Sequence, residues 1–163
     1  MQKAGNEKTS AWLTGMKNNI NNSVFNKHSK IVKAVADGKK AIGLVNHYYI
    51  YRHLEKHPDA PIQILLPDQG KNDIGVAWNV AGVALSQYSQ RQDAAEKFID
   101  FVTSQAGQQL FASVNREYPT RPGVAAAPEV PAAGSYKIAD VPMAELGKYR
   151  NQTLDLIEAV GMP

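Results

Sequence analysis

The chain contains no cysteine among its 163 residues. Disulfides, thiolate metal sites and cysteine nucleophiles are therefore excluded. Long apolar runs are missing too, so the sequence predicts no membrane-spanning helix. The first apolar cluster is short and broken by polar residues, and we expect no signal peptide in this chain. The rest is ordinary for a globular domain, with 44% hydrophobic and 20% charged residues.

Signatures of catalysis are also missing. The sequence has no Gly-rich phosphate loop, no G-x-S-x-G and no H-E-x-x-H. Acidic residues such as Glu55, Asp59 and Asp68 follow no paired pattern. We therefore expect a binding protein and not an enzyme.

Positive charge is concentrated in residues 1–57, which hold ten Lys and Arg against three Asp and Glu. The remaining residues hold eight Lys and Arg against twelve Asp and Glu. The lysines are spread along the segment instead of clustering, so we expect a solvated surface and no nucleic-acid partner. Such a surface would still attract anionic metal chelates.

The hydrophobic pattern predicts an α/β fold, because short apolar runs alternate with helical periodicity. Helices are expected over 6–18, 29–38, 46–57, 92–102, 105–114 and 143–160. Strands are expected over 40–45, 62–66, 74–78 and 81–86. Ser29 should cap the second helix and Gly38 should end it. The segment 119–133, rich in Pro, Ala and Gly, is expected to connect elements without joining the core.

The junction between the expected strand 40–45 and the helix 46–57 is the candidate site. Ligands bind α/β proteins where a strand feeds a helix, and the free N–H groups of a helix start attract anions. Asn46 is a good helix-capping residue. Deprotonated Tyr48 and Tyr49 would be hard oxygen ligands for Fe(III), a hard cation. The alternative is that two amphipathic side chains simply pack against the edge of a helix.

Adjacency restricts how these two phenols can act together. On a regular helix, neighbouring side chains point about 100° apart. At a helix start the backbone is not yet helical, so Tyr48 and Tyr49 can converge. We expect Tyr51 and Tyr118 to pack instead of binding a metal, and we do not expect His47 to be a ligand.

Residues 34–52, which contain Gly43-Leu44-Val45-Asn46-His47-Tyr48-Tyr49, resemble the "GLVN-x-YY" segment of the periplasmic ferric-iron-binding proteins of bacterial ABC importers. Three other segments resemble the same family in the same order: Thr9–Lys17 ("W-L-x-G-hydrophobic-K"), Ser104–Gln109 ("S-x-x-G-Q") and Glu117–Arg121 ("EYP-x-R"). The resemblance covers nearly the whole chain.

This resemblance implies a function for the junction. Tyr48 and Tyr49 would ligate Fe(III), and Asn46 would help to hold a synergistic anion such as carbonate, phosphate or a citrate-like molecule. The protein would be periplasmic and would deliver iron to the membrane subunits of an ABC permease. His28 and Lys27 stand where the family often has a polar residue near the anion. They depart from its common asparagine-containing pattern, so a contact there stays open.

The implied fold is of periplasmic binding protein type II, a partial two-lobe architecture with a hinge crossing. Residues 1–78 would form a second-lobe segment carrying the tyrosines. Residues 79–128 would return to the first lobe, and 129–163 would form a helical tail packing back on the second.

The resemblance covers only the C-terminal half of such proteins. We therefore expect a fragment, or one piece of a nicked protein, whose partner is the missing N-terminal half or a second copy of this chain. Several alternatives remain: a complete small protein, a binder of another small anion or organic solute, or a non-functional fragment that self-associates. An enzyme or a nucleic-acid-binding domain reusing the fold is a further alternative.

Overall fold

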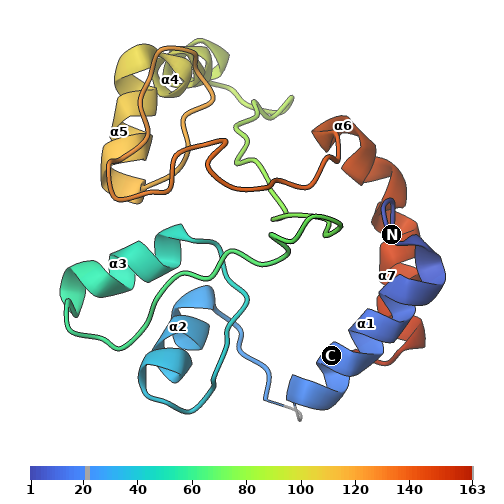
Figure 1. Cartoon of the computed structure of the whole chain (residues 1–163). Helices are drawn as coiled ribbons and strands as arrows, with labels where there is room; N and C mark the ends of the chain where they lie inside the picture. The colour runs from blue at the N-terminus through green and yellow to red at the C-terminus, as the bar shows by residue number, and fades with distance from the viewer. Residues whose placement is uncertain (21–22, 163) are drawn as a thin grey trace. The chain divides into compact units, whose positions relative to one another are not determined.

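The computed structural model describes residues 1–20 and 23–162. Its helices, labelled in Figure 1, are α1 (Gly5–Ile20), α2 (His28–Ala36), α3 (Tyr48–Lys56), α4 (Gln92–Thr103), α5 (Gln105–Asn115), α6 (Met143–Leu146), the 3₁₀ helix η1 (Gly147–Tyr149) and α7 (Arg150–Ala159). The chain divides into two compact units. The first comprises Met1–Lys27, Pro67–Asn79 and Lys137–Pro163, and the second comprises His28–Leu66 and Val80–Tyr136.

In the first unit, α1 packs against α7. Leu13 is buried, and the Nζ of Lys17 donates a hydrogen bond of 2.9 Å to the carbonyl oxygen of Val160 near the end of α7. The expected helix 143–160 is interrupted, because η1 separates α6 from α7. Gly147 begins this interruption, and glycine has a low helix propensity.

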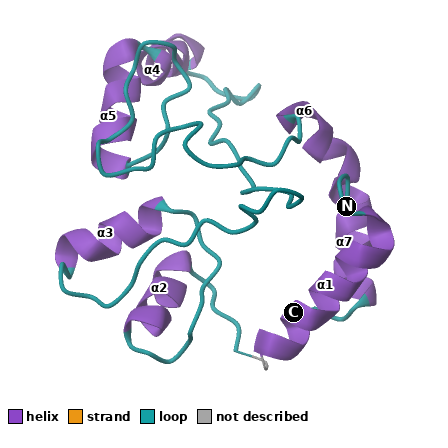
Figure 2. Cartoon of the chain, in the orientation of Figure 1, coloured by secondary structure: helices purple, strands orange, loops and turns teal. Residues whose placement is uncertain are grey.

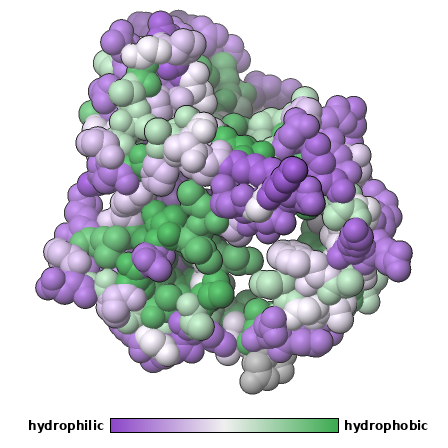
Figure 3. Space-filling view, viewed as in Figure 1, coloured by the Kyte–Doolittle hydropathy of each residue, from purple (hydrophilic) through white to green (hydrophobic). Residues whose placement is uncertain are grey.

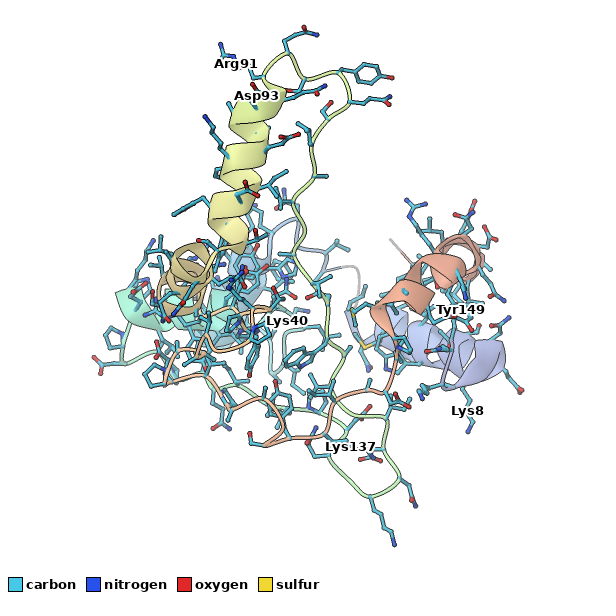
Figure 4. The ribbon with its side chains drawn as sticks, turned by 90° about the horizontal axis from the view of Figure 1, so that it is seen from above. Lys8, Lys40, Arg91, Asp93, Lys137 and Tyr149 are labelled. Carbon is cyan, nitrogen blue, oxygen red and sulfur yellow. The ribbon has the colours of Figure 1, made fainter. Side chains whose placement is uncertain are left out.

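The first unit also contains one parallel β-bridge, between Val76 and Ile138. The carbonyl oxygen of Val76 accepts a hydrogen bond of 2.9 Å from the N–H of Ala139. The N–H of Val76 donates a hydrogen bond of 3.0 Å to the carbonyl oxygen of Lys137. Lys137, labelled in Figure 4, also donates from its Nζ to the carbonyls of Gly70 and Lys71, both at 3.1 Å. These bonds join residues far apart in the sequence.

In the second unit, α2 packs against α3 and α4 against α5. As expected, Gly38 stops α2: the helix ends at Ala36, and Gly38, two residues later, has a φ of +71°. The N–H of Gly38 donates to Val35 and that of Lys39 to Ala34, both at 2.9 Å, which is the Schellman pattern. The prediction that Ser29 caps α2 is wrong, because the helix already begins at His28.

The corner between α4 and α5 is formed by Ser104–Gln109, one of the segments that resemble the iron-binding family. Ser104 caps α5 by accepting a hydrogen bond of 3.1 Å from the N–H of Gly107, which is buried. Gln108 donates from its side chain to the carbonyl of Val102 at 2.9 Å and accepts from the N–H of Thr120 at 2.9 Å. Ser104–Gln109 and Glu117–Arg121 therefore meet here. Figure 4 labels Arg91 and Asp93 at the other end of α4.

The four expected strands are not formed in the described part of the chain (Figure 2). No ladder of strand hydrogen bonds forms in the expected strands 40–45, 62–66 and 81–86. In 74–78 there is only the single bridge at Val76. A segment becomes a strand only when a neighbour pairs with its N–H and C=O groups. The large exposed side chains include Ile42 at 71%, Leu44 at 59% and Leu65 at 71%. Figure 3 displays hydrophobic side chains on the surface around α2 and α3.

The segment 119–133 is irregular, as expected, but it is not outside the core. Ala127 and Val130 are buried within it. In the residues that the structure describes, no helix is both long and apolar enough to cross a membrane.

Candidate phenolate site at the start of α3

Helix α3 begins with Tyr48 and Tyr49, and their side chains come together. The preceding residue, His47, takes a helical conformation at the N-cap. The two rings have centroids 4.6 Å apart and are tilted by 39°. Both tyrosines are half-buried. The pair is therefore close enough for both phenols to face one ligand.

Asn46 contacts this pair, although not as a cap. The prediction that it caps α3 is wrong, because His47 holds the N-cap position without a capping side-chain bond. The Nδ2 of Asn46 instead donates a hydrogen bond of 2.9 Å to the Oη of Tyr48. The asparagine amide therefore bonds to a phenol of the site, while the N–H groups of Tyr49 and Ile50 donate to the backbone carbonyls of Asn46 and His47.

The pKa of Tyr48 is raised above its ordinary value. Burial is the main cause, the negative charge of Tyr49 when ionised adds to it, and the hydrogen bond from Asn46 partly opposes it. Without a ligand, Tyr48 is therefore a neutral phenol at pH 7. A cation bound there must displace the proton.

His28 lies beside the same pair. Its ring centroid is 4.8 Å from that of Tyr49, and its Nδ1 is 3.5 Å from the backbone nitrogen of Asn46. The guanidinium of Arg52 lies 5.6 Å from the ring centroid of Tyr49. The sequence left a role for His28 open, and the structure places it next to the tyrosines.

Other aromatic residues around the site are held by backbone carbonyls. The Oη of Tyr51 donates to Glu129 at 2.8 Å, and that of Tyr118 donates to Pro131 at 2.6 Å. The Nε2 of His47 lies 2.6 Å from the carbonyl oxygen of Arg116, so this nitrogen carries the proton. These contacts pack the three side chains against the unit, as expected for Tyr51 and Tyr118.

Arg116 joins α3 to α5, and no sequence pattern pointed to it. It ends α5 in the left-handed conformation, with a φ of 59°. Its side chain forms ion pairs with Glu129 at 2.8 Å and with Glu55 of α3 at 3.2 Å. These contacts raise the pKa of Arg116, Glu129 contributing most. The ion pair with Glu55 adds a polar contact to the packing of α3 against α2.

The backbone conformation of Arg116 gives a testable prediction. Arg116→Ala and Arg116→Gly remove the same side-chain bonds. The left-handed conformation costs both arginine and alanine about 1 kcal/mol more than it costs glycine. Urea unfolding followed by circular dichroism should therefore place the alanine variant below both the wild type and the glycine variant. An alanine variant as stable as the glycine variant would contradict this account.

In the described ranges 1–20 and 23–162, no group of three or more His, Asp or Glu side chains could hold a metal ion. The candidate site therefore depends on Tyr48 and Tyr49, with Asn46 and His28 beside them.

Comparison with known families now adds to this geometry. Residues 2–137 match the family described as bacterial extracellular solute-binding protein. The chain belongs to this family. The expectation of a binding protein instead of an enzyme agrees with the family and with the relatives that follow.

Similar proteins of the solute-binding family are named for iron. Iron uptake protein A2 of Synechocystis is 29% identical over 164 residues, covering 96% of this chain and 47% of that protein. The major ferric iron-binding protein of Neisseria meningitidis is 30% identical over 113 residues, covering 69% of this chain and 34% of that protein. The resemblance to ferric-iron-binding proteins is thus confirmed.

A solved structure supports the fold class. The apo ferric ion-binding protein A of Pasteurella haemolytica matches this solute-binding protein with a TM-score of 0.84 and 27% identity. The match covers 98% of this chain and 50% of that one. The α/β class of periplasmic binding protein type II is thereby confirmed, although the expected strands are unpaired here. The chain spans about half the length of these relatives or less.

Proposed function

We propose that this protein binds Fe(III) through the phenolates of Tyr48 and Tyr49 together with a synergistic anion. The observation that carries the proposal is the convergence of the two rings, 4.6 Å apart at the start of α3. Deprotonated phenols are hard oxygen ligands, which suit a hard trivalent cation. The names of the relatives, which include iron uptake and ferric iron-binding proteins, support the same cation.

The anion would sit beside Asn46, at the N-terminal end of α3. Backbone N–H groups and the positive end of the helix favour negative charge at this place. Asn46 can turn its Nδ2 from Tyr48 towards an anion once the phenol is deprotonated. His28 is close enough to contribute a further hydrogen bond. Carbonate, phosphate and a citrate-like anion all fit this chemistry.

We further propose that iron passes from this protein to the membrane subunits of an ABC permease in the periplasm. Membership of the extracellular solute-binding family supports this assignment. A relative from Serratia marcescens, 29% identical, is named as an Fe(3+)-binding periplasmic protein. In the two-lobe assignment, which stays a prediction, 1–78 and 129–163 belong to one lobe and 79–128 to the other.

We also propose a second polypeptide partner, and the unpaired segments support it. Ile42, Leu44 and Leu65 are exposed on segments with strand-like sequences. Unpaired backbone groups next to apolar side chains favour pairing with another chain. The partner would be the half of the fold that this chain does not cover, or a second copy of the chain.

An iron titration tests the proposed function. Fe(III) added to the chain should produce a visible phenolate-to-iron absorption band, whereas binding of an anion or organic solute without iron would give no colour. Two phenols fill only part of the roughly six positions of a hard octahedral ion. Excess citrate should therefore strip the iron and bleach the band.

Two results would each contradict one part of this proposal. Absence of a visible band at saturating Fe(III) would remove the phenolate assignment. Retention of the band against excess citrate would leave that assignment intact but would show that the chain completes its site without a second lobe.

A further inference from the structure

A pair of histidines lies at the end of α3, away from the tyrosines. His53 is in the last turn of the helix and His57 is its C-cap, four residues later. The N–H of His57 donates to the carbonyl of His53 at 2.9 Å, which holds the turn closed. Side chains four residues apart lie on the same face of a helix. The backbone therefore keeps the two residues on one side of the helix end.

The spacing of the two rings fits a shared metal ion. Their centroids are 4.7 Å apart, with a tilt of 40°. A histidine nitrogen binds Zn²⁺ at about 2.0–2.1 Å, and the ring centroid lies about 1 Å further out. Two rings on one ion, at an angle of about 90–110°, would therefore have centroids about 4.5–5 Å apart. The distance between the two rings is therefore compatible with one shared ion.

The surroundings of His53 favour its neutral form, which is the form that binds a cation. Burial lowers the pKa of His53, and the charges of His57 and Lys33 lower it further, while Asp37 opposes them. Asp37 is itself engaged by Lys33 at 2.9 Å and by Lys39 at 3.2 Å. His57 is exposed and His53 half-buried, so an ion can reach both rings from solvent.

We propose that His53 and His57 form a second metal site, which takes a borderline divalent cation such as Zn²⁺, Ni²⁺ or Cu²⁺. Neutral imidazole suits these ions, whereas Fe(III) prefers hard oxygen donors. Water completes the coordination, since the pair supplies two ligands. A bound ion cross-links the last turn of α3 and stabilises the folded helix by linkage. This site is independent of the phenolates at the other end of the helix.

The test uses Zn²⁺ and the untagged chain at about pH 7.5, where imidazole is mostly neutral. Zn²⁺ should shift the imidazole proton resonances of His53 and His57 with a stoichiometry of one ion per chain. His53→Ala and His57→Ala should each weaken binding at least tenfold. Lys56→Ala, which changes an exposed side chain of the same turn, should bind Zn²⁺ as the wild type does. Circular dichroism verifies that each variant keeps its helices.

Further readouts keep the test decisive if a variant folds poorly. Zn²⁺ binding to the wild-type chain should fall away below about pH 6, because protons compete with the metal for imidazole nitrogens, whose ordinary pKa is about 6.5. The double variant Tyr48→Phe/Tyr49→Phe should bind Zn²⁺ unchanged. Shifts confined to His28 and His47, or unchanged affinity in both alanine variants, would overturn the proposal.

Discussion

Phenylalanine at Tyr48 or Tyr49 is expected to weaken Fe(III) binding by more than about 100-fold, and phenylalanine at both to abolish the visible band. Changes in residues that only support a metal ligand typically cost about 10–100-fold in affinity, so loss of a ligand should cost more. Each substitution removes one oxygen and keeps the ring, so the contact between the rings at 4.6 Å is preserved. Absorbance titration and competition with citrate would measure the loss.

The same substitution at Tyr51 is the matched control. Tyr51 belongs to the same helix, but its Oη donates to the carbonyl of Glu129, at 2.8 Å. Tyr51→Phe should keep the visible band and lose only that hydrogen bond. Tyr88→Phe, at a side chain that is 80% exposed, should change neither binding nor stability. Loss of the band in Tyr51→Phe, or its persistence in the double variant, would refute the assignment of the two ligands.

Alanine at Gly107 is expected to destabilise the second unit by about 1–3 kcal/mol, the usual cost of overpacking. A Cβ there would overlap the carbonyl oxygen of Phe101 and lie 2.8 Å from the Cα of Val102. These are backbone atoms, so the clash is relieved only if α4 and α5 move apart. Urea unfolding followed by circular dichroism should give a lower midpoint than the wild type.

Alanine substitutions at two other glycines serve as controls. They show the effect of an added methyl group where it meets no other atom. Gly15 lies inside α1, and a Cβ added to it would meet no atom within 4 Å; Gly82 is equally open. Gly15→Ala should stabilise its helix by up to about 1 kcal/mol, because alanine has the higher helix propensity. Gly82→Ala, in the same unit as Gly107, should have little effect. If Gly107→Ala behaved like these two, the close approach of α4 and α5 would be wrong.

The helices could be predicted because their signals are local. Periodic apolar residues located α1, α2, α3, α4 and α5 to within about two residues at each end. Gly38 ended α2 because a left-handed residue closes the Schellman pattern there. The capping residues of α2 and α3 were harder to predict from the sequence. A residue such as Ser29 or Asn46 can bond to several backbone and side-chain partners, and the sequence does not state which partner is near.

The strands could not be predicted in the same way. Residues 40–45 have the apolar composition of a buried strand, but a ladder requires a second segment in register. In the described residues that requirement is met only by Val76 and Ile138. The solved structure that confirms the fold class is about twice as long, and the match covers 50% of that chain.

The residue types together with the family resemblance predict which side chains bind Fe(III), because ligand hardness is a property of the side chain and the adjacent Tyr48 and Tyr49 match the family's segment. They also indicate the helices, since helical hydrogen bonds form within each segment. Tertiary packing, by contrast, brings His28 beside Tyr49. It also joins α3 to the end of α5 through the ion pair between Glu55 and Arg116. The distance between the two phenol rings is likewise known only from the structure. The contacts of His28 and Arg116 join residues far apart in the sequence. Their proximity depends on the packing of whole elements, which no local pattern encodes.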